Sequence, residues 1–180
     1  MLYVIHITGG PVWQGFTCLE FAVLGYMEKG TGEMTHKEKA LTLFKQKYHC
    51  SQAVLAAYAE ECGLTEKQAL MLGACFGSGM RKGEVCGACT GALMVLGMKY
   101  GQFDITDTAS RTAENAKAVQ FLDEFAKRKG SYVCREILGC DLRTEEGRNY
   151  ARSNGLFGKL CPEMVRTAAE ILTEMLGGNE

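Results

Sequence analysis

The sequence is short of prolines and of runs of like charge, and each shortage excludes something. Only two prolines, Pro11 and Pro162, occur among 180 residues, so almost nothing prevents long helices across the middle of the chain. Lys, Arg, Asp and Glu are interspersed, and the formal net charge is −1. Without a basic stripe or run, nucleic acid is not expected as a partner, and there is no electrostatic reason to expect a membrane surface.

Long hydrophobic runs are missing as well. Residues 1–30 are apolar, but Gly9-Gly10-Pro11 and Glu20 divide them. The resulting runs are shorter than the roughly 18 residues that a membrane span needs. No cationic segment precedes the first run, as a secretory signal would require. We therefore expect a cytoplasmic protein without a membrane-spanning segment.

What is present is the composition of an ordinary globular domain, with 47% hydrophobic and 23% charged residues. Capping boxes, which mark helix starts, are formed by Thr35 with Glu38 and by Thr65 with Gln68. Apart from residues 2–7, no segment shows the alternation of a strand. We predict an all-α fold, a single-domain bundle of about six helices over residues 35–178. Residues 1–34 are expected to form an N-terminal extension outside this domain.

Helical periodicity and glycine stops place the expected helices along the chain. They run over about residues 36–48, 51–61, 66–75, 87–100, 107–129 and 161–177, with a short helix over 131–138. Residues 76–86 and 141–158 are expected to be loops, the second with up to one turn of helix. The apolar helix over 87–100 carries glycines that admit a close neighbour, so it is either core or a homodimer face.

Nine cysteines are the unusual feature of this composition. They occupy positions 18, 50, 62, 75, 86, 89, 134, 140 and 161. An odd number, in a chain long enough to build its own core, argues against a secreted domain held together by disulfides. In a reducing compartment, the same richness indicates metal binding or reversible thiol chemistry.

Four of the cysteines lie at expected helix starts, namely Cys50, Cys86, Cys134 and Cys161. A helix N-terminus has unpaired N–H groups and about half a positive charge, which lower the pKa of a nearby thiol. The thiolate is both the nucleophile and the metal ligand, so these four are the candidate ligands. Cys89 is considered with Cys86 below. We expect the other four to be buried hydrophobic residues or inert thiols; they are Cys18, Cys62, Cys75 and Cys140.

Cys86-Gly-Ala-Cys89 is a CxxC motif and supplies two candidate catalytic thiols. The thioredoxin use of this motif needs a preceding strand, which is not expected here. A c-type haem site would need His at position 90, where the chain has Thr, and a zinc site of two CxxC knuckles lacks its second motif. His49 is either a base or ligand beside Cys50 or a surface residue at a helix junction.

Several motifs in order resemble one known family. They are His49-Cys50-Ser-Gln-Ala-Val, Phe76-Gly-Ser-Gly-Met80, Val85-Cys-Gly-Ala-Cys-Thr-Gly-Ala-Leu-Met-Val-Leu-Gly97, Gly130-Ser-Tyr-Val-Cys-Arg-Glu-Ile-Leu-Gly139 and Cys161. Over about residues 35–176 the chain resembles the C-GCAxxG-C-C family, whose members are described as redox-active and look related to the iron–sulfur-carrying domain of split-Soret cytochrome c. The resemblance implies that Cys50, Cys86, Cys134 and Cys161 are the functional cysteines. The haem-attachment part of that cytochrome is absent, so no haem is expected, and Cys89 is an addition to the family pattern.

Three classes of function follow. The first is electron transfer or redox sensing, with an unidentified redox partner, through an iron–sulfur cluster on those four cysteines, most simply [2Fe–2S], with zinc as the alternative metal. The second is a metal-free thiol–disulfide protein in which Cys86 attacks and Cys89 or Cys50 resolves. The third is a helical interaction module with merely buried cysteines. No acid–base pair indicates a particular catalysed reaction, so an oxidoreductase activity stays open.

Overall fold

The computed structural model describes residues 34–178, so the predicted extension lies outside the described residues except for Met34. Within them, the chain forms nine α-helices, a 3-10 turn and a π-helical turn, and no strand beyond one isolated bridge between Val85 and Val133. The predicted all-α class is confirmed. The helices are α2 (His36–Lys45), α3 (Cys50–Ala57), α4 (Glu66–Gly73), α5 (Gly87–Tyr100), α6 (Thr108–Lys129), α7 (Cys134–Leu138), α8 (Glu145–Ser153), α9 (Leu156–Lys159) and α10 (Cys161–Leu176).

The helix count exceeds the expected six mainly because residues 141–158 are not a loop. Thr144 caps α8 by accepting a hydrogen bond from the Gly147 N–H at 3.0 Å, and two glutamates follow in the first turn, where the helix dipole favours them. Gly155, with φ 64°, then turns the chain into α9. The helix expected over residues 66–75 ends as the 3-10 turn η1 (Ala74–Phe76), and the loop expected from residue 76 holds the π-helical turn η2 (Gly79–Gly83).

The capping boxes start α2 and α4 as the sequence predicts. The Thr35 hydroxyl accepts from the Glu38 N–H at 3.2 Å, and Thr65 accepts from the Gln68 N–H at 3.3 Å. In return, the Thr35 N–H donates to the Glu38 side chain and the Thr65 N–H donates to the Gln68 side chain, both at 2.9 Å. These local signals fix where the helices begin, so the starts are better predicted than the ends.

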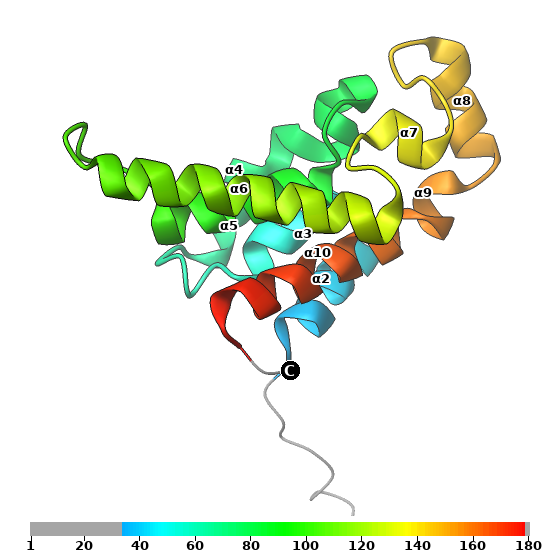
Figure 1. The fold of residues 1–180 in the computed structure, drawn as a ribbon. Coiled ribbons are helices and arrows are strands. Elements are labelled where there is room, and N and C mark those ends of the chain that lie inside the picture. The colour runs from blue at the N-terminus through cyan, green and yellow to red at the C-terminus, as the bar shows by residue number, and fades with distance from the viewer. Residues whose placement is uncertain (1–33, 179–180) are drawn as a thin grey trace, which may run out of the picture. The chain divides into compact units, whose positions relative to one another are not determined.

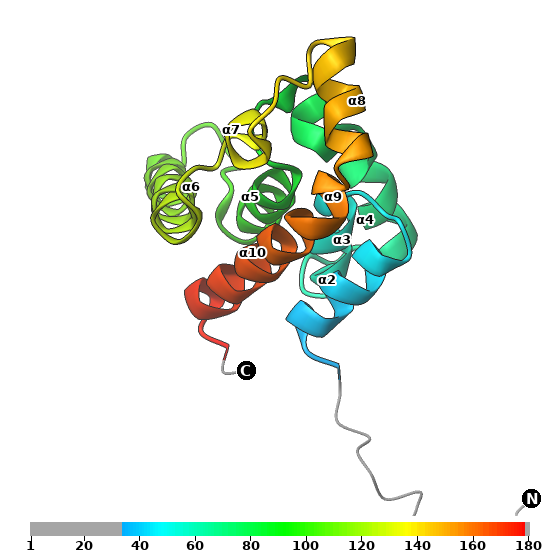
Figure 2. The same ribbon diagram turned by 90° about the vertical axis from the view of Figure 1, so that its right-hand side faces the viewer.

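The core is built around α3, which packs against α2, α4, α5 and α10 (Figures 1 and 2). Nearly every residue of α3 is buried, including Ala53, Val54 and Ala56 at 0% exposure. The long helix α6 covers α5 from the other side through the buried rings of Phe121 and Phe125. Tyr58, at the end of α3, donates its buried hydroxyl to the Ala169 carbonyl of α10 at 2.7 Å.

The apolar helix α5 has the bounds that the sequence predicts and approaches α3 closely. A Cβ added at Gly91 would lie 2.7 Å from the Ser51 carbonyl oxygen, and one at Gly87 would lie 3.2 Å from the Cys50 Cβ. Gly87 and Gly91 therefore serve the packing of α5 against α3 in the core. The homodimer alternative stays a prediction.

No helix within residues 34–178 is long and apolar enough to cross a membrane.

Candidate functional site

Four helix starts bring four cysteines together in the core. Cys50, Cys134 and Cys161 are the first residues of α3, α7 and α10, and Cys86 is the N-cap of α5. All four are buried, with exposures between 3% and 8%. Negative charge on Cys86, Cys134 or Cys161 raises the pKa of Cys50, so their sulfurs lie within electrostatic reach of one another. The structure thus gathers the four cysteines singled out from the sequence, and we call them the four-cysteine cluster.

The β-bridge between Val85 and Val133 holds one pair of the cluster. The Cys86 N–H donates to the Tyr132 carbonyl at 2.8 Å, and the Cys134 N–H donates to the Glu84 carbonyl at 2.6 Å. Because these hydrogen bonds flank the bridge, the backbones that carry the two cysteines run antiparallel and adjacent. The starts of α5 and α7 are therefore fixed relative to each other by backbone, independently of any sulfur contact.

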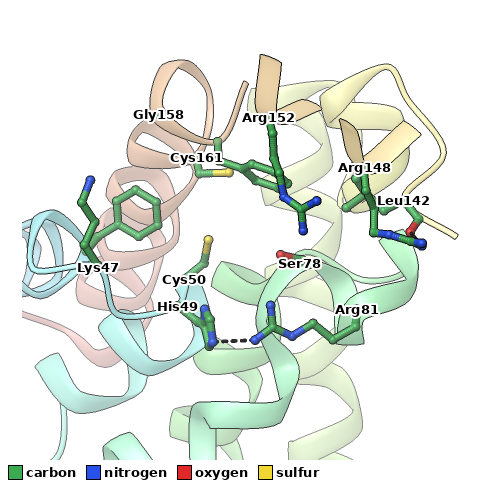
Figure 3. Close-up of a pocket in the computed structure, with 12 residues that line it drawn as sticks. Lys47, His49, Cys50, Ser78, Arg81, Leu142, Arg148, Arg152, Gly158 and Cys161 are labelled. Atoms are coloured by element: carbon green, nitrogen blue, oxygen red, sulfur yellow. Dashed lines mark hydrogen bonds between the residues drawn. The ribbon is translucent and has the colours of Figure 1, made fainter. Parts of the chain in front are cut away.

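Cys50 and Cys161 form the second pair. Hydrogen bonding to the Cys161 sulfur is the largest cause of the raised pKa of Cys50, and the two side chains face each other in Figure 3. The pairs meet because Gly87 lets the start of α5 approach the start of α3. A Cβ at Gly87 would lie 3.2 Å from the Cys50 Cβ, the Ser51 nitrogen and the Phe76 carbonyl oxygen.

Thiol acidity departs from the expectation that every helix start favours a thiolate. The pKa of Cys50 is well above its usual range, because of its hydrogen bonding to the Cys161 sulfur and because it is buried among other thiols. Burial, and then charge on Cys86 and Cys161, also raise the pKa of Cys134. For these two cysteines the expectation was wrong: the hydrogen bond to Cys161 and then burial outweigh the helix terminus at Cys50, and burial outweighs it at Cys134, where α7 is only five residues long.

Cys86 is different, because its pKa is lowered despite burial. The largest cause is a hydrogen bond from the Cys89 thiol, followed after opposing burial by the Ala88 and Cys89 backbone N–H groups. The donor, Cys89, is fully buried and its pKa lies well above its usual range. Within the CxxC motif, Cys86 is therefore the more acidic thiol and Cys89 the less acidic one.

The remaining cysteines are not at the four helix starts, although Cys140 lies near enough to Cys134 for its charge to raise the pKa of that thiol. Cys62 is buried and Cys140 half-buried, and burial raises the pKa of both thiols. Cys75 is exposed, so the buried alternative expected for it does not hold. Cys18 lies outside the described residues.

No group of three or more His, Cys, Asp or Glu residues within 34–178 is placed to hold a single metal ion. The cluster is instead arranged in the two pairs described above. A [2Fe–2S] cluster takes four cysteine ligands, so the four-cysteine cluster matches it in the kind and number of donors.

A cavity of about 430 Å³ opens beside the cluster and has Cys50 and Cys161 in its wall (Figure 3). Its lining also contains Lys47, Arg81, Arg148 and Arg152, none of which stood out in the sequence. A signal for two of them existed, because Arg148 and Arg152 lie four residues apart and share one face of α8. It was missed because that segment was expected to be a loop. We call this cavity the thiol pocket.

His49 also lines the thiol pocket, between Cys50 and Arg81. Its pKa is lowered by burial and then by the charge of Arg81, so the ring is neutral at neutral pH. Arg81 Nη2 donates to His49 Nε2 at 2.7 Å. In the structure, His49 is a half-buried residue that contacts an arginine. The role of base or ligand stays a prediction.

No curated protein and no solved structure matches this chain. A family model does match, over residues 48–175, and its description reads "Putative redox-active protein (C_GCAxxG_C_C)". The matched segment runs from just before α3 almost to the end of α10 and contains the whole four-cysteine cluster. The chain therefore belongs to the C_GCAxxG_C_C family.

Proposed function

We propose that this protein transfers or senses electrons through a [2Fe–2S] cluster held by Cys50, Cys86, Cys134 and Cys161. The observation that carries the proposal is that four buried cysteines from four separate helix starts converge in the core. Buried cysteines that merely fill space have no reason to gather in this way. The family description, a redox-active protein, supports the same class of function.

The electrostatics of the site favour a positively charged ligand that would allow the four cysteines to lose their protons together. Mutual repulsion helps to raise the pKa of Cys50 and Cys134, so four bare thiolates could not coexist there. Iron ligation removes the thiol proton outright and offsets this charge. The Ala88 and Cys89 backbone N–H groups in the first turn of α5 bond to the Cys86 sulfur and would stabilise negative charge that remains there. When bound, the cluster would supply a reversible one-electron couple.

The direct test is to purify the protein without oxygen and to measure its visible spectrum, iron, acid-labile sulfide and zinc. We expect absorbance between about 320 and 460 nm, with about two irons and two sulfides per chain. Stoichiometric zinc without iron would replace the cluster with a structural metal. A colourless, metal-free protein with every thiol titratable would overturn the metal proposal altogether.

A second candidate is thiol–disulfide exchange at Cys86 and Cys89, favoured by the hydrogen bond between their sulfurs. The Cys86 thiolate would attack a partner disulfide and release one partner thiol. Cys89 would then lose its proton and displace the other sulfur, so that a Cys86–Cys89 disulfide forms while the partner disulfide gains two electrons. Cys86 is only 3% exposed, so a protein partner reaches it only after local opening. For this reason we rank exchange second.

Exchange chemistry makes a prediction about pH. Because the Cys89 thiol is the largest cause of the lowered Cys86 pKa, the C89A variant should raise that pKa. In C89A, alkylation of Cys86 should then begin to increase at a higher pH than in the wild type. The alkylation rate at about pH 7 should fall severalfold. Iodoacetamide labelling of the metal-free protein, read by peptide mass spectrometry, measures the profile. C140A is the matched control and should leave it in place; an unmoved C89A profile would remove Cys89 from the chemistry of Cys86.

A further inference from the structure

The thiol pocket is built by segments that are distant in the sequence. Phe44 and Lys47 come from the end of α2 and the turn after it, and Ser78 and Arg81 from the η2 region. Helices α8 and α9 close the opposite side (Figures 2 and 3). The cavity volume of about 430 Å³ lies in the range of small-molecule sites, about 300–1,000 Å³. The pocket is therefore large enough for a metabolite-sized ligand placed against two cysteines of the cluster.

The charge in the lining has one sign. Four of the twelve lining residues are cations, Lys47, Arg81, Arg148 and Arg152, and none is acidic. No ion pair found among residues 34–178 involves any of these four. Figure 3 shows Lys47 on one side of the cysteines and the arginines on the other. Uncompensated positive charge around a concave site raises the local concentration of anions.

The protein groups that the arginines contact are neutral. Arg148 donates to the Leu142 carbonyl at 3.0 Å and to the Arg143 carbonyl at 2.9 Å. Arg152 donates to Asn149 Oδ1 at 3.4 Å, and Arg81 donates at 2.7 Å to His49 Nε2, a ring that carries no negative charge. These hydrogen bonds hold the guanidinium groups without neutralising them. An oxyanion can therefore still form charge-assisted bonds to each arginine.

Backbone strain concentrates at the same place. Among the described residues, four non-glycine residues have positive φ, namely Lys47, Ser78, Met80 and Arg81. Three of them, at φ 76°, 55° and 63°, line the thiol pocket, and Met80 belongs to the same left-handed turn as two of these. Strained backbone of this kind persists where the surrounding structure fixes it and is concentrated at binding sites. The strain thus marks the pocket independently of its charge.

Other parts of the wall are apolar and are formed by Phe44, Leu142 and Phe157. A ligand that satisfied only the cations would leave these surfaces in water. We propose that the thiol pocket binds a small organic anion with two or more carboxylate or phosphate groups, its carbon skeleton resting on Phe44 and Phe157. Such a ligand lies directly beside Cys50 and Cys161. The proposal concerns binding alone and does not require that those cysteines hold iron.

Isothermal titration calorimetry at low ionic strength tests this proposal, with citrate as the carboxylate probe, fructose 1,6-bisphosphate as the phosphate probe and neutral glycerol as the blank. We expect one site per chain for at least one anion, weakened by added NaCl. The two anion arms tell carboxylate from phosphate recognition. No heat from either anion at millimolar concentration would overturn the proposal.

Variants then locate the site. R152Q and K47Q should each weaken binding roughly tenfold, the usual size of one lost charge-assisted contact. Both side chains are exposed, so the fold should survive, which circular dichroism checks. K67Q removes an exposed cation outside the pocket and should bind as the wild type does. If R152Q, K47Q and K67Q all bind equally well, the pocket is not the site. Iron analysis of the wild type decides the cluster separately, so failure of one proposal is distinguishable from failure of the other.

Discussion

Replacement of Cys134 by serine is expected to remove the redox centre completely. Cys134 is 5% exposed, and its backbone is held beside that of Cys86 by the hydrogen bond from its N–H to Glu84. Serine keeps that backbone contact but offers a hard oxygen in place of the soft thiolate that iron–sulfur clusters take. We therefore expect C134S, purified without oxygen, to lose the visible absorbance and essentially all iron while its helical circular dichroism stays unchanged.

The matched control is C140S, six residues along the chain. Cys140 is only half-buried and is a near neighbour of Cys134 but not one of the four proposed ligands, so its loss should leave iron and spectrum intact. C50S, C86S and C161S should behave like C134S. Iron retained in C134S, or lost equally in C140S, would show that the cluster residues are wrongly assigned.

Cys89 separates the two redox chemistries. It is the donor to Cys86 but not one of the four proposed ligands, so the cluster proposal expects C89A to keep its iron. In the exchange alternative, C89A loses the resolving thiol, and oxidation stops at a mixed disulfide on Cys86. Iron retained in C89A therefore favours the cluster, whereas a mixed disulfide that accumulates on Cys86 favours exchange.

Much of the site could be predicted because its position is set by local signals. The cluster cysteines lie at helix starts, and helix starts are encoded in short patterns, as in the bounds of α5 and the capping boxes of α2 and α4. The family resemblance selected the same four positions. Their convergence, by contrast, depends on contacts distant in the sequence, such as the bridge between Val85 and Val133.

What could not be predicted depends on tertiary surroundings. Helix starts favour thiolates, yet burial and the neighbouring thiols raise the pKa of Cys50 and Cys134. Helix α8 could not be recognised in the polar sequence of residues 141–158, because Ala151 is the one buried residue of this helix. With α8 missed, the cationic wall formed by Arg148 and Arg152 was missed too.

Replacement of Gly91 by alanine is expected to cost about 2 kcal/mol of folding stability, as overpacking of a core typically does. The new Cβ would lie 2.7 Å from the Ser51 carbonyl oxygen and 3.1 Å from the Val54 Cβ. The nearest atom is backbone of α3, which cannot swing aside as a side chain can. Helices α3 and α5 must therefore separate, and Cys50 moves with α3.

Gly97 supplies the control within the same helix. Nothing lies within 4 Å of a Cβ placed there, so G97A should raise stability by up to about 1 kcal/mol through helix propensity alone. Urea unfolding of G91A and G97A measures the two opposite shifts. Because Ser51 adjoins Cys50, G91A should also bind less iron than G97A under equal conditions. Equal stability of the two variants would mean that α3 and α5 do not meet at Gly91, and the approach that joins the two cysteine pairs would then need another cause.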